Sequence, residues 1–441
     1  MSSSSESIFA RPFHLQGNFA PVFEEQTLTN LRTTGTIPPE LSGRFFRNGA
    51  NPKSGTSPHW FLGDGMLHGV RLEAGRAVWY RNRWVRTTRF LHPESGANED
   101  GTPDRTASLA NTHVICHAGR IMALEEGHFP WVVSKELETV GVHDFGGKLK
   151  TAMTAHPKIC PETGELLFFG YSPIPPYLTY HRVAKDGTLV QSEEITVKGP
   201  TMMHDWNVTR NHVVFMDLPL VFDLEMLAQG GIPIRWSDDY GARLGVMPRN
   251  GSDKDVVWYE IEPCYVFHPM NAYEEGDDLV LDVARFKKLA FGPNDTGGTP
   301  ALLHRWVIDT KKRTVGEQPL DDRPADFPRV ADSVVGLKHR YGYMAGLGGD
   351  IPNEFGKRLI KYDLQSGKSQ EWVTSGAGEP VFVQTGHAED EGYVLTFVYD
   401  PATNTSDLVI LDAQNFAKGP VARVHLPVRV PYGFHGSWIA D

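Results

Sequence analysis

Short runs in which apolar and aromatic residues alternate with polar ones recur along the whole chain, and Gly, Asn, Asp or Pro bounds each run. This pattern is typical of β-strands joined by tight turns. The clearest runs are RAVWYRNRWV (76–85), ELLFFGY (165–171), HVVFMDL (212–218), DVVWYEI (255–261), DLVLDVARF (278–286), LLHRWVIDT (302–310), RLIKYDL (358–364), YVLTFVYD (393–400) and DLVILDA (407–413). Helical spacing is scarce, and only SKELETV (134–140) and DLEMLAQ (223–229) are expected to form short helices. The chain is therefore predicted to be all-β.

Among large all-β folds, a β-propeller suits a single domain of 441 residues, because radial repetition of four-stranded blades avoids long exposed edges. Seven blades of roughly 50 to 60 residues would use most of the chain. The 44 Gly and 31 Pro are spread evenly, so no linker marks a domain boundary. We expect a disordered lead over 1–10 and one propeller domain over 11–441. A propeller ring is commonly closed by pairing strands from the two chain ends, which gives the tail a role as a clasp.

Charge and cysteine content narrow the function. The net charge of −11, with no block of Lys or Arg, argues against nucleic acid as a partner. The three cysteines form no Cys-x-x-Cys pair, which argues against a disulfide framework and a cysteine zinc site. The start, MSSSSESIFARPF, lacks the features of a signal peptide, and the most apolar stretch, VVFMDLPLVFDLEML (213–227), is interrupted by carboxylates. We expect a cytoplasmic protein with no obligate protein partner.

Three histidines repeat one local plan. His156, His204 and His268 each precede a turn and an apolar strand, with about ten residues from the histidine to the strand core. Equivalent positions on successive hairpins of a radial fold face one axis, so these imidazoles are predicted to converge as metal ligands. His113 and His387 fit the same plan loosely, and spacing alone does not choose among the five. For any single histidine, an ordinary semi-buried position is the competing interpretation.

The chain ends in PYGFHGSWIAD, which places aromatic residues and glycines around His435. Chain ends usually fray, so this composition indicates a segment that is held in place.

The motifs together resemble the carotenoid cleavage oxygenase family, which includes apocarotenoid oxygenases, stilbene-cleaving dioxygenases and retinoid isomerases. The matching stretches are FRNGANP (46–52), HWFLGDGMLHG (59–69), YRNRWVRT (80–87), AHPK (155–158), MMHDWNVT (202–209), FHPMNA (267–272), DFPRV (326–330), EPVFV (379–383) and VPYGFHGSWI (430–439). The resemblance implies a seven-bladed propeller with a cap of loops and short helices over the metal face. It also implies one Fe(II) per chain, held by His156, His204, His268 and His435, and not by His113 or His387. The tail is then the segment that holds the last ligand.

The resemblance further implies three carboxylates that accept hydrogen bonds from the ligand imidazoles, at Glu126, Asp326 and Glu379. Glutamate is usual at the position of Asp326. Because aspartate is one methylene shorter, we expect a closer backbone, a bridging water or a ligand held differently.

The implied reaction is the oxidative cleavage of a conjugated carbon–carbon double bond, with dioxygen as co-substrate and two carbonyl products. No catalytic base is expected, because the protein's task is to position the alkene and exclude water. Phe61, Trp206 and Phe267 are the predicted substrate contacts.

A carotenoid or apocarotenoid is the favoured substrate. Stilbene-cleaving relatives usually carry a lysine immediately before the first outer glutamate, where this chain has Glu125. A stilbene or phenylpropenoid, of the lignostilbene or isoeugenol type, is the alternative. YSPIPPYL (171–178) and FDLEMLAQGGIPIRW (222–236) are expected to form an apolar entrance that touches a membrane. A non-catalytic propeller scaffold and a Ca²⁺-dependent propeller hydrolase are the rival classes, although imidazoles suit softer metals than Ca²⁺.

Overall fold

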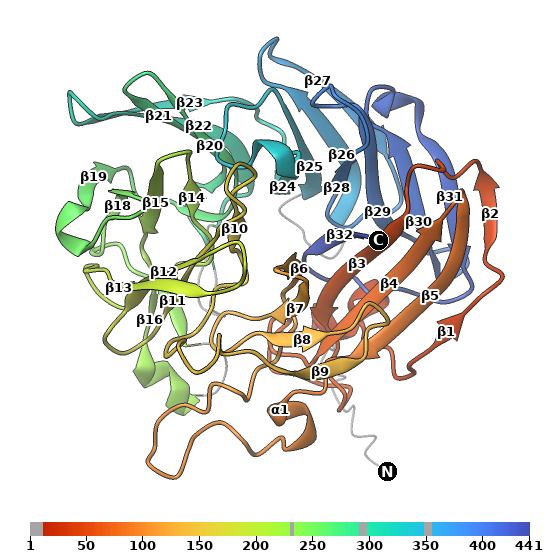
Figure 1. Cartoon of the computed structure of the whole chain (residues 1–441), viewed down its shortest axis with the longest axis horizontal. Coiled ribbons are helices and arrows are strands. Elements are labelled where there is room, and N and C mark those ends of the chain that lie inside the picture. Colours follow the sequence, from red (N-terminus) through yellow and green to blue (C-terminus); the bar gives the residue numbers. More distant parts are fainter. Residues whose placement is uncertain (1–11, 230–232, 291–297, 348–354) are drawn as a thin grey trace, which may run out of the picture.

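The computed structural model describes residues 12–229, 233–290, 298–347 and 355–441, and in it seven antiparallel sheets surround a central axis (Figure 1). The predicted fold class, a seven-bladed β-propeller, is confirmed. The expected disordered lead over 1–10 lies outside the described residues.

The sheets follow one another in chain order, except where the two chain ends meet. In blade one β32 (Gly436–Ala440) is innermost, followed by β3 (Gly43–Ala50), β4 (Gly65–Glu73), β5 (Arg76–Trp84) and β1 (Thr27–Leu28). Blade two contains β6 (His113–His117), β7 (Arg120–Leu124), β8 (Trp131–Val133) and β9 (Thr139–Val142). Blade three contains β10 (Lys158–Ile159), β11 (Leu166–Tyr171), β12 (Leu178–Val183) and β13 (Leu189–Glu194). Blade four contains β14 (Asn207–Val208), β15 (His212–Asp217), β18 (Ala242–Pro248) and β19 (Val257–Ile261).

The remaining three blades complete the ring. Blade five contains β20 (Tyr265–Glu275), β21 (Asp278–Phe286), β22 (Ala301–Asp309) and β23 (Thr314–Pro319). Blade six contains β24 (Ala325–Arg329), β25 (Tyr341–Leu347), β26 (Phe355–Asp363) and β27 (Lys368–Val373). Blade seven contains β28 (Val381–Gln384), β29 (Gly392–Asp400), β30 (Thr405–Asp412), β31 (Pro420–Leu426) and β2 (Arg32–Gly35).

Outside the blades, the described residues form one hairpin and several short helices. The hairpin is β16 (Leu220–Phe222) with β17 (Ile234–Trp236), and the α-helix is α1 (Thr88–Leu91). The 3₁₀ helices are Phe13–Leu15, Gly17–Phe19, Leu224–Gln229, Asp253–Asp255, Asp332–Val334 and Phe416–Lys418. Within the described ranges, no helix is long and apolar enough to cross a membrane.

Apolar side chains fill the space between neighbouring blades, as packed sheets require. The largest core cluster runs through blades three, four and five and contains Trp206, Phe215, Tyr265 and Trp306, each at most 1% exposed. The runs predicted as strands therefore form strands because their apolar faces bury against the next blade.

The chain ends close the ring twice. The tail strand β32 pairs antiparallel with β3, from Gly43 opposite Ala440 to Arg47 opposite Gly436. The N-terminal strand β2 pairs with β31 of blade seven, on the outside of that blade. The predicted clasp is confirmed for the tail, and β2 adds a second closure.

Of the two short helices predicted from the sequence, one is present, and the prediction of the other is wrong. Leu224–Gln229 is a 3₁₀ helix, whereas 134–138 forms the turn between β8 and β9 and 139–140 begins β9. Leu137 has a φ of 65°, and the Ser134 hydroxyl accepts hydrogen bonds from the backbone N–H groups of Glu136 (3.2 Å) and Glu138 (3.1 Å). A serine that bonds its neighbours' backbone competes with the helix, and this competition explains the error.

Candidate metal centre

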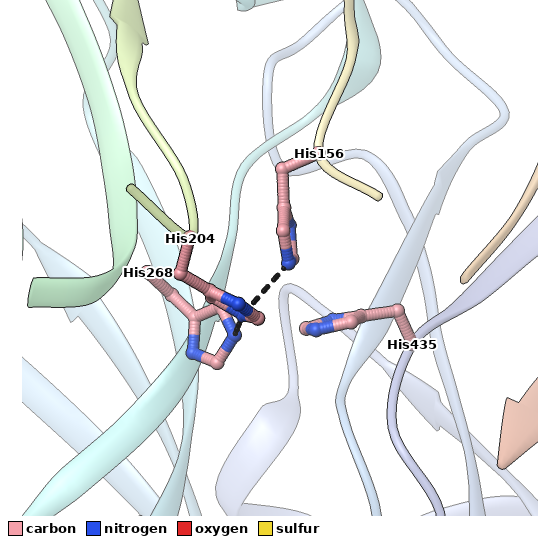
Figure 2. Close-up of side chains that lie close together, drawn as sticks. All are labelled: His156, His204, His268 and His435. Carbon is pink, nitrogen blue, oxygen red and sulfur yellow. Dashed lines mark hydrogen bonds between the residues drawn. The ribbon is translucent and has the colours of Figure 1, made fainter. Parts of the chain in front are cut away.

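Four histidines from remote parts of the chain converge at the centre of the ring (Figure 2). His268 lies within the innermost strand β20, while His156, His204 and His435 lie one to three residues before β10, β14 and β32. The Nε2 atoms of His156 and His204 are 2.9 Å apart, and those of His204 and His268 are 3.3 Å apart. One nitrogen from each of the four rings lies within 4.8 Å of the others, and all four residues are buried. These are the four positions that the family motifs indicated.

Three imidazoles have a carboxylate behind them, buried at Asp326 and Glu379 and half-buried at Glu126, and each carboxylate was named from the sequence. Glu379 Oε1 lies 2.9 Å from Nδ1 of His435, and Asp326 Oδ1 lies 2.9 Å from Nδ1 of His268. Glu126 contacts Nδ1 of His204. The carboxylates that bond Nδ1 of His268 and His435 fix the proton there, which leaves the Nε2 lone pairs of these two rings free for a metal ion.

Electrostatics keep two of the four imidazoles, those of His156 and His435, in the neutral form that a cation requires. Burial, followed by the neighbouring imidazoles, holds the pKa values of His156 and His435 well below the usual 6.5. Burial also acts to lower the pKa of His268, but the charge and hydrogen bond of Asp326, with help from more distant carboxylates, raise it overall. Neutral imidazoles are the form that binds metals.

The donor set fits a first-row transition ion. With metal–nitrogen bonds of about 2.1 Å, nitrogens on opposite sides of an ion lie about 4 Å apart, which is close to the spacing of these atoms. Imidazole suits ions such as iron, cobalt or zinc, whereas Ca²⁺ and Mg²⁺ prefer oxygen. The four residues would therefore hold such an ion with little rearrangement.

Asp326 reaches its imidazole directly, despite the short side chain. Oδ1 also accepts a hydrogen bond from the backbone N–H of Phe327 at 2.8 Å, and Phe327 has a φ of 53°. The pairing of β24 with β25 shifts register between Asp326 and Arg329. The expected outcomes were a closer backbone, a bridging water or a ligand held differently. The direct contact makes a bridging water unnecessary.

The fourth imidazole has a different partner, which the sequence reasoning missed. Asp205, 2% exposed, has Oδ2 at 3.4 Å from Nδ1 of His156 and Oδ1 at 2.8 Å from Nζ of Lys158. Its Oδ1 also accepts the backbone N–H of Trp206 at 2.7 Å. The available signal was the position of Asp205 directly after a predicted ligand in MMHDWNVT.

The two histidines that only fitted the spacing lie outside the group of four. His113 is a neighbour, with its ring centroid 5.2 Å from that of His435, and its Nδ1 lies 2.8 Å from the carbonyl oxygen of Ala155. His387 is exposed in the connection between β28 and β29.

Aromatic rings line the site beside His204. Phe267 meets His204 edge to face at 5.1 Å, and Phe61, from the long connection between β3 and β4, lies 6.4 Å from Phe267. Phe327, which the sequence reasoning did not name, stacks on His268 at 4.9 Å. Trp206 is fully buried and its indole N–H donates to the His156 carbonyl at 3.1 Å. This position suits a role in holding His156, and a substrate contact by Trp206 stays a prediction.

Four imidazoles converge on the axis of a seven-bladed propeller, and carboxylates contact their outer nitrogens. This arrangement is typical of a metalloenzyme. The family model described as retinal pigment epithelial membrane protein matches residues 19–440. The chain is 37% identical to a carotenoid cleavage oxygenase of Mycobacterium tuberculosis, over 96% of this chain and 97% of that protein. It is 34% identical to carotenoid 9,10(9',10')-cleavage dioxygenase 1 of Arabidopsis thaliana, over 98% and 90% of the two chains.

Solved structures give the same result. The lignostilbene dioxygenase of Pseudomonas brassicacearum superposes with a TM-score of 0.89 at 30% identity, covering 98% of this chain and 99% of that one. Cobalt-substituted apocarotenoid oxygenase of Synechocystis superposes with a TM-score of 0.85 at 27% identity, covering 96% and 98%. The chain belongs to the carotenoid cleavage oxygenase family and is a dioxygenase of this type, which confirms the family and the enzyme class predicted from the motifs.

Proposed function

We propose that the protein is a non-haem Fe(II) dioxygenase that cleaves a conjugated carbon–carbon double bond of a lipophilic substrate. The observation that carries this proposal is the convergence of His156, His204, His268 and His435 within 4.8 Å of one another. Relatives at 37% and 34% identity are named for the cleavage of carotenoids, which supports the reaction class.

Fe(II), when bound, supplies the redox chemistry with dioxygen that converts one alkene into two carbonyl groups. Both oxygen atoms enter the products, so no external reductant is needed. The protein's own side chains hold the ion, orient the alkene and exclude water. Phe61, Phe267 and Phe327 provide flat apolar surfaces beside the imidazoles, as a planar conjugated substrate requires.

A carotenoid or apocarotenoid is the substrate class that we favour. Glu125, next to Glu126, lies 2.6 Å from Nδ1 of His128 through Oε2, and its Oε1 accepts the Gly127 N–H at 2.8 Å. Burial acts to raise the pKa of Glu125, but the charge and hydrogen bond of His128 win and lower it. A carboxylate stands where stilbene-cleaving relatives usually carry a lysine, so this position offers no cation to a phenolate. A stilbene or phenylpropenoid remains the second candidate, because the lignostilbene dioxygenase has the same fold over nearly the whole chain.

The proposal includes contact with a membrane, from which a polyene would be drawn. Ile174 is 50% exposed and Leu224 is 46% exposed, on the two segments predicted to form an apolar entrance. The rings of Tyr171 and Phe222, at the start of those segments, lie 5.8 Å apart, so the two segments are neighbours. Sedimentation with phospholipid vesicles tests this part, because Ile174→Asp with Leu224→Asp should abolish co-sedimentation. The cytoplasm remains the proposed location, and cell fractionation checks it.

Anaerobic reconstitution with Fe(II), followed by oxygen uptake with an apocarotenal, a hydroxystilbene and isoeugenol in parallel, tests the reaction and the substrate. Uptake with the apocarotenal and two aldehyde or ketone products is expected. Turnover of the phenolic compounds alone would overturn the substrate preference. His435→Ala should abolish iron retention and uptake, with the exposed His387→Ala as the matched control, and an active His435→Ala protein would remove the tail from the site.

A further inference from the structure

A cavity of about 540 Å³ runs along the propeller axis and ends at the candidate metal centre. Residues of the inner strands β6, β10, β14, β20, β24 and β32 line it, and these strands surround the centre of the ring in Figure 1. Its lining includes three of the four imidazoles, those of His156, His268 and His435. His204 and the neighbouring rings of Phe61 and Phe267 do not line it. Trp206 and Phe327 do line it, so the cavity reaches three of the imidazoles and lies apart from the rings of Phe61 and Phe267.

The axial cavity carries charged groups. Lys158 pairs with Asp205 at 2.8 Å, and Arg329 lies 3.4 Å from Glu379 and donates to the Gly436 carbonyl at 2.9 Å. Asp332, whose side chain is 82% exposed, also lines the cavity and lies 3.7 Å from Arg329. His204, which does not line the cavity, has the ring of Phe267 and the carboxylate of Glu126 as neighbours, and the ring of Phe61 lies beyond Phe267.

A hydrated divalent cation cannot cross an aromatic wall cheaply, because moving an ion out of water into an apolar environment carries a large desolvation cost. The lining of the cavity is partly apolar, but the carboxylates of Asp205, Asp332 and Glu379 along it can replace the hydration shell of an ion step by step. We propose that the axial cavity is the passage through which the divalent metal ion reaches and leaves the four imidazoles, separate from the aromatic side that receives the alkene. This inference rests on the metal centre of the proposed function.

Cys116 provides a direct test, because it lines the cavity and is exposed, whereas Cys160 and Cys264 are buried. Alkylation of metal-free protein with a bulky maleimide should therefore place one large group in the passage, which mass spectrometry verifies. The readout is the visible absorption of Co²⁺ on binding, followed in time, and its loss to an excess of chelator. An obstructed passage slows loading and release by the same factor, at least about tenfold, and leaves the Kd unchanged, since equilibrium does not depend on the route. Cys116→Ser treated with the same reagent is the matched control and should load as fast as untreated protein.

A second test uses charge without adding bulk. Asp332→Lys should slow Co²⁺ loading by about threefold to tenfold at about 10 mM salt and much less at about 1 M salt, where charges are screened. Asp238→Lys is the control, because the Asp238 side chain is equally exposed, at 80%, but does not line the cavity.

Two kinds of failure are distinguishable. Metal-free protein that binds no Co²⁺ at equilibrium would overturn the metal centre itself. Full binding at unchanged rates, in both the alkylated protein and Asp332→Lys, would overturn the passage and leave the metal centre intact.

Discussion

Replacing Asp326 by glutamate, the residue usual in the family, should damage the site in this protein. The Asp326 carboxylate already lies 2.9 Å from Nδ1 of His268 and 2.8 Å from the Phe327 N–H, and the residue is 4% exposed. One added methylene lengthens the side chain by about 1.5 Å, more than a 2.9 Å contact can absorb. Either the glutamate leaves its preferred rotamer or His268 is displaced. Overpacking of this kind costs about 1–3 kcal/mol.

The assay has two readouts. Urea unfolding of the metal-free protein measures the loss of stability caused by the strain. Competition between the protein and a chelator measures the affinity for Co²⁺, which depends on the position of His268. Loss of outer hydrogen bonding typically weakens metal binding by about 10- to 100-fold, and we expect Asp326→Glu to fall in that range. Asp326→Asn is the matched control, because it keeps the size and removes the charge, so it should weaken Co²⁺ binding with a smaller loss of stability. An Asp326→Glu protein as stable and as tight for Co²⁺ as the parent would refute the reasoning from distance.

Three further predictions concern the surroundings of the centre. Asp205→Asn should weaken Co²⁺ binding by about 10-fold or more in the same competition assay, because the fourth imidazole then loses its nearest carboxylate; unchanged affinity would exclude Asp205 from the site. Burial acts to lower the pKa of His128, but Glu125 raises it above 6.5, and the pKa of Glu125 is lowered below 4.5. The ion pair thus stabilises the fold most between pH 4.5 and 6.5, and this stabilisation is lost as the pH rises through the raised pKa of His128. The difference in free energy of unfolding between the parent and His128→Gln, measured by urea unfolding, should therefore shrink above pH 6.5. Gly43→Ala should destabilise the protein by about 1–3 kcal/mol and speed metal loss, because its Cβ would meet a backbone carbonyl of β32 at 2.6 Å. Gly316→Ala should be nearly neutral, because its Cβ would meet its nearest neighbour, the Val307 carbonyl oxygen, at 3.9 Å.

The fold was predictable because the alternation along the chain reports directly on strands with one face against the next blade. The prediction from residue spacing was wrong at 134–140, where the composition favours a helix. The Ser134 hydroxyl bonds the backbone there, and Leu137 has a left-handed backbone conformation. Local hydrogen bonding decided that segment, and hydrophobic spacing does not detect it.

The candidate ligands were predictable only in part from spacing. Three of the clustered histidines precede a turn and an apolar strand at the same spacing, but His435 does not. His113 has that spacing roughly, yet it lies outside the cluster of four. Family motifs separated these cases. Asp205 could not be found in this way, because a carboxylate beside a histidine is usually solvated, and its burial depends on the pairing with Lys158 that only the fold creates.

Closure of the propeller and completion of the metal centre are the same structural event. The Asn48 N–H of β3 donates to the His435 carbonyl at 2.9 Å, and the His435 N–H donates to the Thr112 carbonyl at 3.1 Å, just before blade two. The side-chain amide of Asn48, which is fully buried, also donates to the Ala110 carbonyl at 2.8 Å. His435 is thus fixed by backbone bonds to β3 of its own blade and to the residue that precedes blade two, whereas the sequence indicated only aromatic residues and glycines around it. An unclosed ring would carry three converging imidazoles and lack the fourth, so metal binding should report the closure of the whole fold.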